Sequence, residues 1–295
     1  MSASAFAPGK VILMGEHAVV YGHRALAMAV DRGLTVRLEE RPGPTQLDSP
    51  GIQDSRMSAA LHCVLPPTGV GVHIHSTLPI GRGMGSSAAL AVALARAALM
   101  REGRPMSRDA VNNRAFAVER VFHGAPSGID HTVSMHGGAM LYQRNDSGPT
   151  FEPVTLPPLP IVVIDSGTAG NTATMVAKVA EDLPGNAAHL AAMDELLVRT
   201  LPALQRGDGP AIGEAWQENH RLLQAIGVST PTLDTIVRTA IEAGATGAKL
   251  AGAGGGGIVI ALAPDPQAVC SAAAQRGWSA FPIAQASDSS QRVQP

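Results

Sequence analysis

The sequence predicts a protein of mixed α and β structure, organised in roughly two domains. Its 295 residues exceed the ~150 residues that a single domain commonly holds. Segments 11–14 and 35–38 look like strands, and 71–76 alternates apolar with polar residues, which together indicate an early antiparallel sheet. Two helical segments then follow one another with no strand between them. This order differs from the strict alternation of strands and helices that builds a parallel sheet.

The helical segments are recognised by their apolar content and by residues that start or stop a helix. Segment 86–100 is apolar almost all round and too rich in Ala for a strand, so we expect a buried helix there. Ser107 is a candidate N-cap for a second helix that ends near His123, where Gly124 supplies a left-handed stop. The other expected elements are helices at 172–180, 187–204, 212–225, 231–243 and 266–276 and strands at 139–143, 161–164 and 258–262.

The Pro-rich segment 153–160 marks the expected boundary between the two domains. We place an N-terminal domain at 1–157 and a C-terminal domain at 158–286. The polar tail at 287–295 has little to pack and is expected to be disordered. No internal repeat or low-complexity block points to another organisation.

Composition and charge exclude several classes of protein. Lys plus Arg number 22 and Asp plus Glu 24, for a net charge of −2, so we expect no nucleic-acid binding by bulk charge. The longest apolar run, 88–95, is well short of the ~20 residues that span a bilayer, and no signal peptide or membrane helix is expected. The lone Cys63 and Cys270 suit a reducing, cytoplasmic setting.

A glycine-rich loop at 79–89 opens directly into the first expected helix. Its glycines let backbone amides approach an anion, the helix N-terminus adds partial positive charge, and Ser hydroxyls can contact phosphate or a metal ion. It is no Walker A loop, because no Gly-Lys-Ser/Thr ends it. The alternatives are a purely structural glycine turn and a dinucleotide fingerprint, since Gly83 to Ala88 satisfies G-x-G-x-x-A. The fingerprint requires strand, helix and strand, whereas here a second helix follows.

Two further stretches contain residue types that suit chemistry on a phosphate. Lys10 lies in a glycine-flanked motif, and Glu16 with His17 follows at the turn after a strand. Glu119 lies near the end of the second helix, and Asp130 follows a Pro-Ser-Gly turn. Two carboxylates beside a phosphate-binding loop suggest a magnesium ligand and a group that receives a substrate hydroxyl. The alternative for all of these residues is an ordinary solvated surface or a turn cap.

The fourth stretch, 249–257, contains five glycines among the six positions 252–257. Such a run cannot form a stable helix interior or a packed strand, so some backbone there is expected to approach a ligand or another segment closely. A flexible hairpin loop is the alternative.

Four motifs in this order resemble the GHMP kinases. They are Pro8-Gly-Lys-Val-Ile-Leu with Gly15-Glu-His-Ala-Val-Val-Tyr-Gly22, Gly83-Met-Gly-Ser-Ser-Ala-Ala89, His123-Gly-Ala-Pro-Ser-Gly-Ile-Asp130, and Lys249 to Gly257. The resemblance spans about residues 5 to 262 and includes Asn219-His220, Gly227-Val-Ser229 and Leu233-Asp234. The Gly-Glu-His-Ala-Val-Val-Tyr-Gly string resembles members that phosphorylate mevalonate, whereas the galactokinase version of this segment resembles Gly-Glu-His-Thr-Asp.

This resemblance implies a two-domain α+β fold with ATP between the domains. The N-terminal domain would share its fold with a ribosomal protein, and the C-terminal domain would be ferredoxin-like. Asp130 and Lys10 would form the catalytic pair, and Ser87 with Glu119 would hold Mg²⁺. The residues that would contact ATP are Gly81, Gly83, Met84, Gly85, Ser86, Ser87, Ala88, Gly254 and Gly255.

The resemblance also implies the substrate and the partners. Mevalonate would be bound by Lys10, Glu16, His17, Asp130 and Thr172. ATP and Mg²⁺ would be the other small molecules, and a homodimer is an expectation from the family. Nucleic acid and membrane are not expected as partners.

The sequence departs from the family pattern at three positions. Ala251 stands where the family usually has Thr, Ile258 where Cys is frequent, and Ala173 where a basic residue is common. Ala251 and Ala173 lack possible contacts to phosphate or carboxylate, which puts affinity and substrate preference in question more than activity.

Three rival functions are weighed against this one. The first is another GHMP kinase, which would act on phosphomevalonate, on a sugar or on homoserine. The second is a catalytically inactive regulator, and the third is an NAD-dependent oxidoreductase. An inactive regulator should have lost Lys10, Glu119 or Asp130, and all three are present. The succession of two helices argues against the oxidoreductase.

Overall fold

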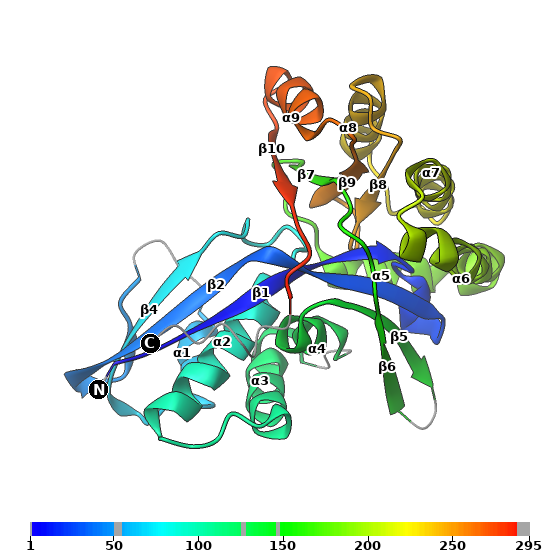
Figure 1. Cartoon of the computed structure of the whole chain (residues 1–295). Coiled ribbons are helices and arrows are strands. Elements are labelled where there is room, and N and C mark those ends of the chain that lie inside the picture. The colour runs from blue at the N-terminus through cyan, green and yellow to red at the C-terminus, as the bar shows by residue number, and fades with distance from the viewer. Residues whose placement is uncertain (1, 50–54, 125–127, 146–147, 288–295) are drawn as a thin grey trace.

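Two β-sheets, each with helices packed on it, make up the computed structural model (Figure 1). The structure describes residues 2–49, 55–124, 128–145 and 148–287. The first sheet is built by the first half of the chain and the second sheet by the second half. The expected α+β fold, with both helices and sheets, is confirmed.

The first sheet is organised around one long strand, β2 (Arg24–Pro44). β2 pairs antiparallel with β1 (Ala3–Met14), with β4 (Thr68–Ser76) and with β5 (Ala139–Asn145). The sheet is completed by β6 (Gly148–Val154), antiparallel to β5, and by the two-residue β3 (Gln46–Leu47), parallel to β4. The early antiparallel sheet expected from the sequence is thus confirmed, whereas β6 and β3 are additions.

Four helices accompany this sheet: α1 (Met57–His62), α2 (Ser86–Arg101), α3 (Arg108–His123) and α4 (Ile129–His136). α2 packs on β1 and β2 with residues 88–99 all buried, which confirms the buried helix. The hydroxyl of Ser107 accepts a hydrogen bond from the amide of Ala110, and Gly124 ends α3 with φ of 66°. α1 and α4 were not expected, because 6 and 8 residues are too few for a clear helical period.

The second sheet has the antiparallel order β10-β7-β9-β8. Its strands are β7 (Ile161–Asp165), β8 (Gly247–Ala251), β9 (Ile258–Leu262) and β10 (Ser279–Ile283). Its helices are α5 (Thr172–Glu181), α6 (Leu183–Arg206), α7 (Gly209–Ala225), α8 (Pro231–Glu242) and α9 (Pro266–Gln275). Every helix expected in this half is present, with bounds that shift by a few residues.

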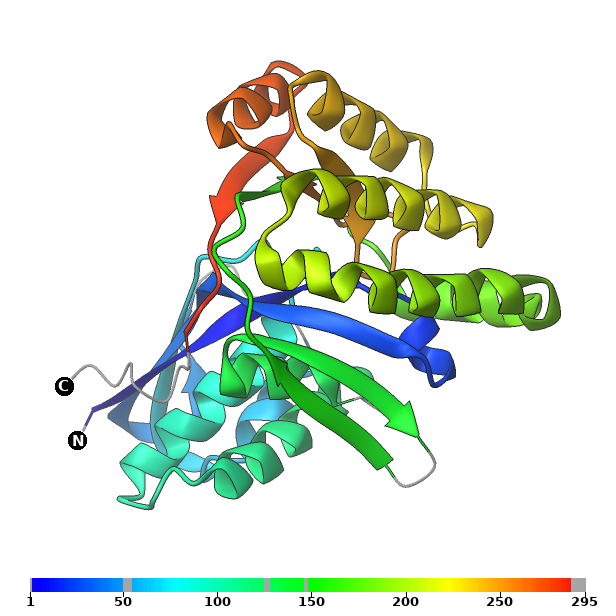
Figure 2. The same ribbon diagram turned by 45° about the vertical axis from the view of Figure 1, so that its right-hand side comes forward.

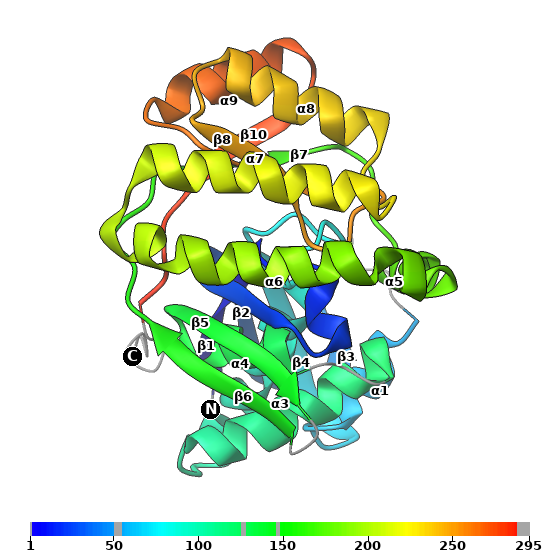
Figure 3. The same ribbon diagram turned by 90° about the vertical axis from the view of Figure 1, so that its right-hand side faces the viewer.

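One large buried apolar cluster contains residues of both halves. α6 lies beside β2 in Figure 3, and its Leu196, Leu197 and Leu204 belong to the same buried cluster as Leu26 of β2. The short 3-10 helix η1 (Ala18–Tyr21) follows β1, and its Ala18 packs in the core of the second sheet. The expected division at 157/158 falls between β6 and β7, where the chain passes from one sheet to the other, and it stays a prediction.

The end of the chain returns to the first sheet. Figure 2 shows the segment after β10 running down to β1 and β2. The amide of Ala286 donates to the carbonyl oxygen of Ala29, and the amide of Gly138 donates to that of Ala286. Most of the tail expected to be disordered, 288–295, lies outside the described residues, as does part of the 123–130 motif, namely 125–127.

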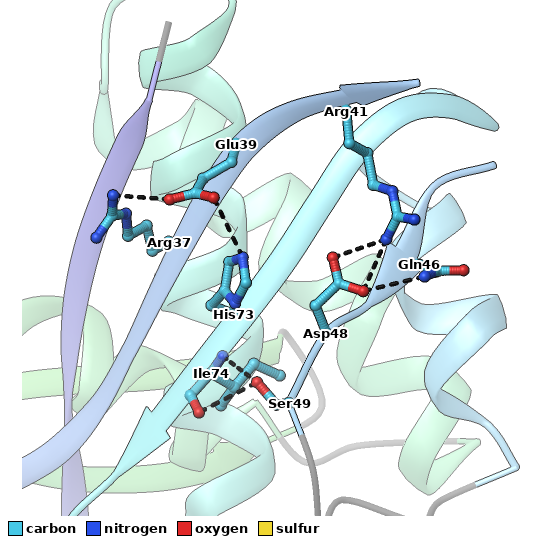
Figure 4. A network of polar contacts seen from close by, with 8 residues as sticks. All are labelled: Arg37, Glu39, Arg41, Gln46, Asp48, Ser49, His73 and Ile74. Carbon is cyan, nitrogen blue, oxygen red and sulfur yellow. Dashed lines mark hydrogen bonds and ion pairs between the residues drawn. The ribbon is translucent and has the colours of Figure 1, made fainter. Parts of the chain in front are cut away.

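A network of polar side chains ties the segment after β2 to the sheet (Figure 4). Arg41 donates to both carboxylate oxygens of Asp48, at 2.7 and 2.8 Å, and Gln46 donates to Asp48 as well. Ser49 exchanges hydrogen bonds with the backbone of Ile74 on β4. Residues 46–49 are therefore held along the edge of β4.

No helix within the described part of the chain is both long enough and apolar enough to cross a membrane.

Backbone contact between α7 and β8 generates a prediction about stability. A Cβ atom on Gly213 of α7 would lie 2.3 Å from the carbonyl oxygen of Thr246, where neither backbone can move freely. We expect Gly213→Ala to lower the free energy of unfolding by about 2 kcal/mol, although Ala favours helices. Urea unfolding measures this difference. Glu214→Ala introduces the same residue on the exposed face of α7 and should change stability by less than about 0.5 kcal/mol; equal effects of the two substitutions would contradict the close packing.

Candidate active site

Lys10 and Asp130 form an ion pair at the centre of the candidate site. Lys10 is on β1 and its side chain is buried, whereas Asp130 lies in the first turn of α4 and is partly exposed. The Lys10 Nζ and Asp130 Oδ1 atoms are 2.9 Å apart. The structure therefore brings together the two residues expected to be the catalytic pair, and it excludes the solvated-surface alternative for Lys10.

The position of Asp130 is set by contacts that fasten α4 to β1. The hydroxyl of Ser134 donates to the carbonyl oxygen of Pro8 at 2.7 Å. The buried guanidinium of Arg96, on α2, donates to the carbonyl oxygens of Phe6 and Met135 at 2.9 and 2.8 Å. Because α4 is only two turns long, anchoring its second turn on β1 also places its first turn.

The glycine-rich loop crosses β1 next to Lys10. The amide of Lys10 donates to the carbonyl oxygen of Met84, and a Cβ atom on Gly85 would lie 2.9 Å from the side chain of Lys10. Gly85 has φ of 69° and no side chain caps the N-terminus of α2. The amides of the first turn of α2 are thus left for an anion, as the loop composition predicted.

The residues of the first glycine loop that are expected to contact ATP differ in their exposure to solvent. Gly81 and Gly83 are exposed and Gly85, Ser86 and Ser87 are partly exposed. The side chains of Met84 and Ala88 are buried, that of Met84 in the apolar core of the first sheet, so these two residues offer only backbone groups to a phosphate.

Ser87 and Glu119 face one another beside the ion pair. The Ser87 hydroxyl is 2.9 Å from Nε2 of His123. Burial, and then the negative charge of Asp130, raises the pKa of Glu119 to about 7, while the Ser87 hydroxyl and Lys10 act in the opposite direction. Oε1 of Glu119 is buried and has no hydrogen-bond partner among the described residues.

These oxygen atoms fit a Mg²⁺ ion. Mg²⁺ prefers carboxylate and hydroxyl oxygens, and an unpartnered buried carboxylate oxygen is relieved by a cation. The described residues contain no group of three or more His, Cys, Asp or Glu side chains that could hold a metal ion. A Mg²⁺ ion held by Ser87 and Glu119 would therefore take its remaining ligands from phosphate and water.

Glu16 and His17 are buried where the two sheets meet. Both carboxylate oxygens of Glu16 are engaged, one by the ammonium of Lys249 on β8 and the other by the amide of Asn219 on α7 at 3.2 Å. Nε2 of His17 is 2.8 Å from the carbonyl oxygen of Ala253. Burial lowers the pKa of His17. Glu16 thus binds protein groups, whereas His17 keeps one ring nitrogen, Nδ1, without a partner among the described residues.

The second glycine run lies against the first. A Cβ atom added to Gly252 would lie 3.9 Å from the backbone of Gly83. Arg82 of the first loop forms an ion pair with Asp165 of β7 at 3.2 Å. The amide of Gly255 donates to the carbonyl oxygen of Val228 and is therefore not available to a phosphate in this structure. The expected contact of Gly254 and Gly255 with ATP stays a prediction.

Thr172 is exposed in the first turn of α5. Gly170 lies two residues earlier, and a Cβ atom added to it would be 2.7 Å from the carbonyl oxygen of Gly254. This segment therefore lies against the second glycine run. Within the described residues, no hydrogen bond or ion pair links Thr172 to Lys10, His17 or Asp130.

Three polar residues at this junction were not predicted as site residues: Asn219, His220 and Lys249. Asn219 and His220 fall between the buried Trp216 and Leu223 on one face of α7. Polar residues on an otherwise apolar helical face were the available signal.

Comparisons with known proteins identify the family of the chain. The family model "GHMP kinases N terminal domain" matches residues 55–138, and "GHMP kinases C terminal" matches 200–278. Mevalonate kinase of Thermococcus sibiricus is 36% identical over 90% of this chain and 91% of that protein, and mevalonate kinase of Pyrococcus horikoshii is 37% identical over 89% of each.

A solved structure extends the similarity to the whole fold. The crystal structure of L. major mevalonate kinase in complex with R-mevalonate superposes with a TM-score of 0.87 at 30% sequence identity, covering 96% of this chain and 95% of that one. The family models, the sequence identity and the fold agree, and the chain belongs to the GHMP kinase family.

Proposed function

We propose that this protein is a mevalonate kinase, which transfers the γ-phosphoryl group of Mg·ATP to the terminal primary hydroxyl of mevalonate and yields 5-phosphomevalonate. Similarity to mevalonate kinases over most of the chain supports this substrate. The observation that carries the chemistry is the Lys10–Asp130 pair, held beside a glycine loop at the uncapped N-terminus of α2.

Asp130 is proposed to receive the proton of the substrate hydroxyl. An alcohol is a far weaker acid than a carboxylic acid, so a carboxylate such as Asp130 cannot deprotonate the hydroxyl outright in the ground state. Full deprotonation is unnecessary, because in a loose transition state the nucleophile keeps its proton until late. Asp130 orients the hydroxyl and accepts the proton as the phosphoryl group arrives.

Lys10 has two proposed roles. Its ammonium lies 2.9 Å from Oδ1 of Asp130, and this charge-assisted contact fixes the position of the carboxyl group. The backbone amide of Lys10 also donates to the carbonyl oxygen of Met84, which holds the lysine beside the glycine loop. Its positive charge would there offset the negative charge that develops on the transferring phosphoryl group. A buried lysine serves here as a compact point charge.

The phosphates and the metal ion are assigned to the glycine loop and to its carboxylate neighbour. Gly81, Gly83, Gly85 and the first-turn amides of α2 would bind the ATP phosphates. Ser87 and Glu119 would hold Mg²⁺, which supplies neutralising charge to the phosphates when it is bound.

His17 and Thr172 are proposed to contact mevalonate, with Glu16 behind His17. We also propose a cytoplasmic location, because the two unpaired cysteines suit a reducing compartment. The two-domain division and the homodimer remain predictions.

The proposed reaction is tested by measuring ADP release with Mg·ATP over a panel of mevalonate, phosphomevalonate, galactose and homoserine. Turnover with mevalonate alone is the expected result. Turnover with another member of the panel would retain the fold and the catalytic pair but overturn the substrate, and the absence of turnover with all four would favour a regulator.

Asp130→Asn is expected to lower kcat by at least about a hundredfold, because the amide cannot accept the proton. Steady-state kinetics with mevalonate measure the effect, and thermal unfolding verifies that the variant is folded. Near-normal turnover of a folded Asp130→Asn protein would exclude Asp130 as the proton acceptor.

Glu119 generates a prediction about pH dependence. Its pKa of about 7 in the folded protein lies above the ordinary 4.5, so folding is favoured at low pH and loses stability as the pH rises from 4.5 through about 7. Without metal or nucleotide, the wild type should lose about 2 kcal/mol between about pH 5.5 and about pH 8 that Glu119→Gln does not lose.

Urea unfolding of both proteins at the two pH values measures this difference. Because other titrating groups are common to both proteins, they cancel in the comparison. The same pH dependence of stability in wild type and Glu119→Gln would show that the pKa of Glu119 is not raised in the folded protein.

A further inference from the structure

A buried ion pair joins the two halves of the molecule beside the candidate substrate site. Glu16 follows β1 in the first half, and Lys249 is on β8 in the second. Neither side chain has any exposed surface, and the Lys249 ammonium contacts Oε1 of Glu16. The amide nitrogen of Asn219 donates to the other oxygen, Oε2, at 3.2 Å. The carboxylate is therefore enclosed by protein groups on both sides.

The stability of the fold is a poor explanation for this pair. Moving two charges out of water carries a large desolvation cost, and well-packed apolar residues in their place often leave stability unchanged or increase it. In some proteins a buried ion pair instead specifies one conformation of the chain. Here the pair includes Glu16, which belongs to a short connecting segment after β1. That segment is the turn at 15–17.

His17, the next residue, is held in an unusual conformation. Its φ of 59° is the only positive value for a non-glycine residue among those described. A residue in this region persists only where its surroundings determine it. On one side of His17 the side chain of Glu16 is enclosed by Lys249 and Asn219, and on the other side Ala18 is packed in the core of the second sheet.

The orientation of the His17 ring follows from its hydrogen bond. Nε2 is 2.8 Å from the carbonyl oxygen of Ala253, and because a carbonyl only accepts, Nε2 carries the proton. In the neutral ring Nδ1 is then an acceptor. It is buried and has no hydrogen-bond partner among the described residues. A hydroxyl group of a substrate is the kind of donor that this atom lacks.

The strand that carries Lys249 is anchored by hydrogen bonds to its neighbouring helices. His220 follows Asn219 on α7, and its Nδ1 accepts a hydrogen bond from the amide of Leu250 at 3.3 Å. Its Nε2 is 3.1 Å from Asp234 of α8, which also accepts from the Ser229 hydroxyl. The lysine thus projects from a strand whose neighbouring backbone is tied to two helices.

We propose that Lys249 is a positioning residue for substrate binding, which acts through Glu16 to hold His17 with its Nδ1 acceptor ready for a hydroxyl group of the substrate. This inference rests on the proposed function, since it names the residue behind one of the proposed mevalonate contacts. Because its side chain has no exposed surface, Lys249 itself would contact neither mevalonate nor ATP.

The test uses a substitution that removes the charge pair without leaving one charge buried alone. Glu16→Gln with Lys249→Met in one protein keeps both side chains near their original length. The matched control is Asp194→Asn, which removes the ion pair between α6 and Arg24 of β2 at 2.6 Å. That pair also links the two halves but makes no contact with His17. Thermal unfolding, kcat and the two KM values are measured for each protein.

We expect the double variant to raise the KM for mevalonate by about tenfold or more, with kcat and the KM for ATP changed by less than about threefold, since misplacement of one contact weakens substrate positioning. Asp194→Asn should lower the unfolding temperature with no change in the KM for mevalonate. A double variant with the wild-type KM for mevalonate, or a control with the same rise, would overturn the proposal.

Asn219→Ala keeps the test decisive if the double variant does not fold. It leaves the ion pair in place and removes the second contact to Glu16, so a raised KM for mevalonate supports the proposal and an unchanged one contradicts it. A wild-type protein without mevalonate turnover would refute the proposed function instead, and the same variants are then measured with whichever member of the substrate panel is turned over.

Discussion

The reactive centre depends on the attachment of α4 to β1. Arg96 is a buried cation, and a buried cation must find hydrogen-bond acceptors. It finds them in the carbonyl oxygens of Phe6 and Met135, and Ser134 adds a bond to Pro8. Because these acceptors lie on β1 and on α4, satisfying one guanidinium joins the two elements. Asp130, one turn earlier on α4, is thereby brought to 2.9 Å from Lys10.

The second half of the chain completes the site because the two sheets meet as one packed body. Apolar residues of α6 and α7 share a buried cluster with the first sheet, and η1 inserts Ala18 into the core of the second. Ion pairs between the two halves also fix their relative orientation: Arg24 with Asp194, Arg82 with Asp165, and Glu16 with Lys249. The last two end at the glycine loop and at the His17 turn. The walls of the site are therefore aligned by the same contacts that join the halves.

Elements whose signals are local in the sequence were predicted most accurately. The apolar run of α2, the N-cap Ser107 and the stop at Gly124 depend only on neighbouring residues. The short α1 and α4 were missed, as were β6 and β10, because a few residues carry too weak a period. The glycine loop was also recognised, but the motif does not indicate which of its side chains are exposed. The burial of the Met84 and Ala88 side chains was therefore not predicted.

Residue types and their order along the chain determined the candidate chemistry: a glycine loop at a helix start, a lysine, two carboxylates, and a second glycine run. The tertiary structure decided which of these groups meet. Glu16 and Lys249 are 233 positions apart, and nothing near either residue indicates a charged partner. Asn219 lies in the middle of a helix whose partner is a turn of the other half. A local pattern reports hydrogen bonds and packing within a few residues, whereas the burial that makes a charge require a partner exists only after distant segments have packed together.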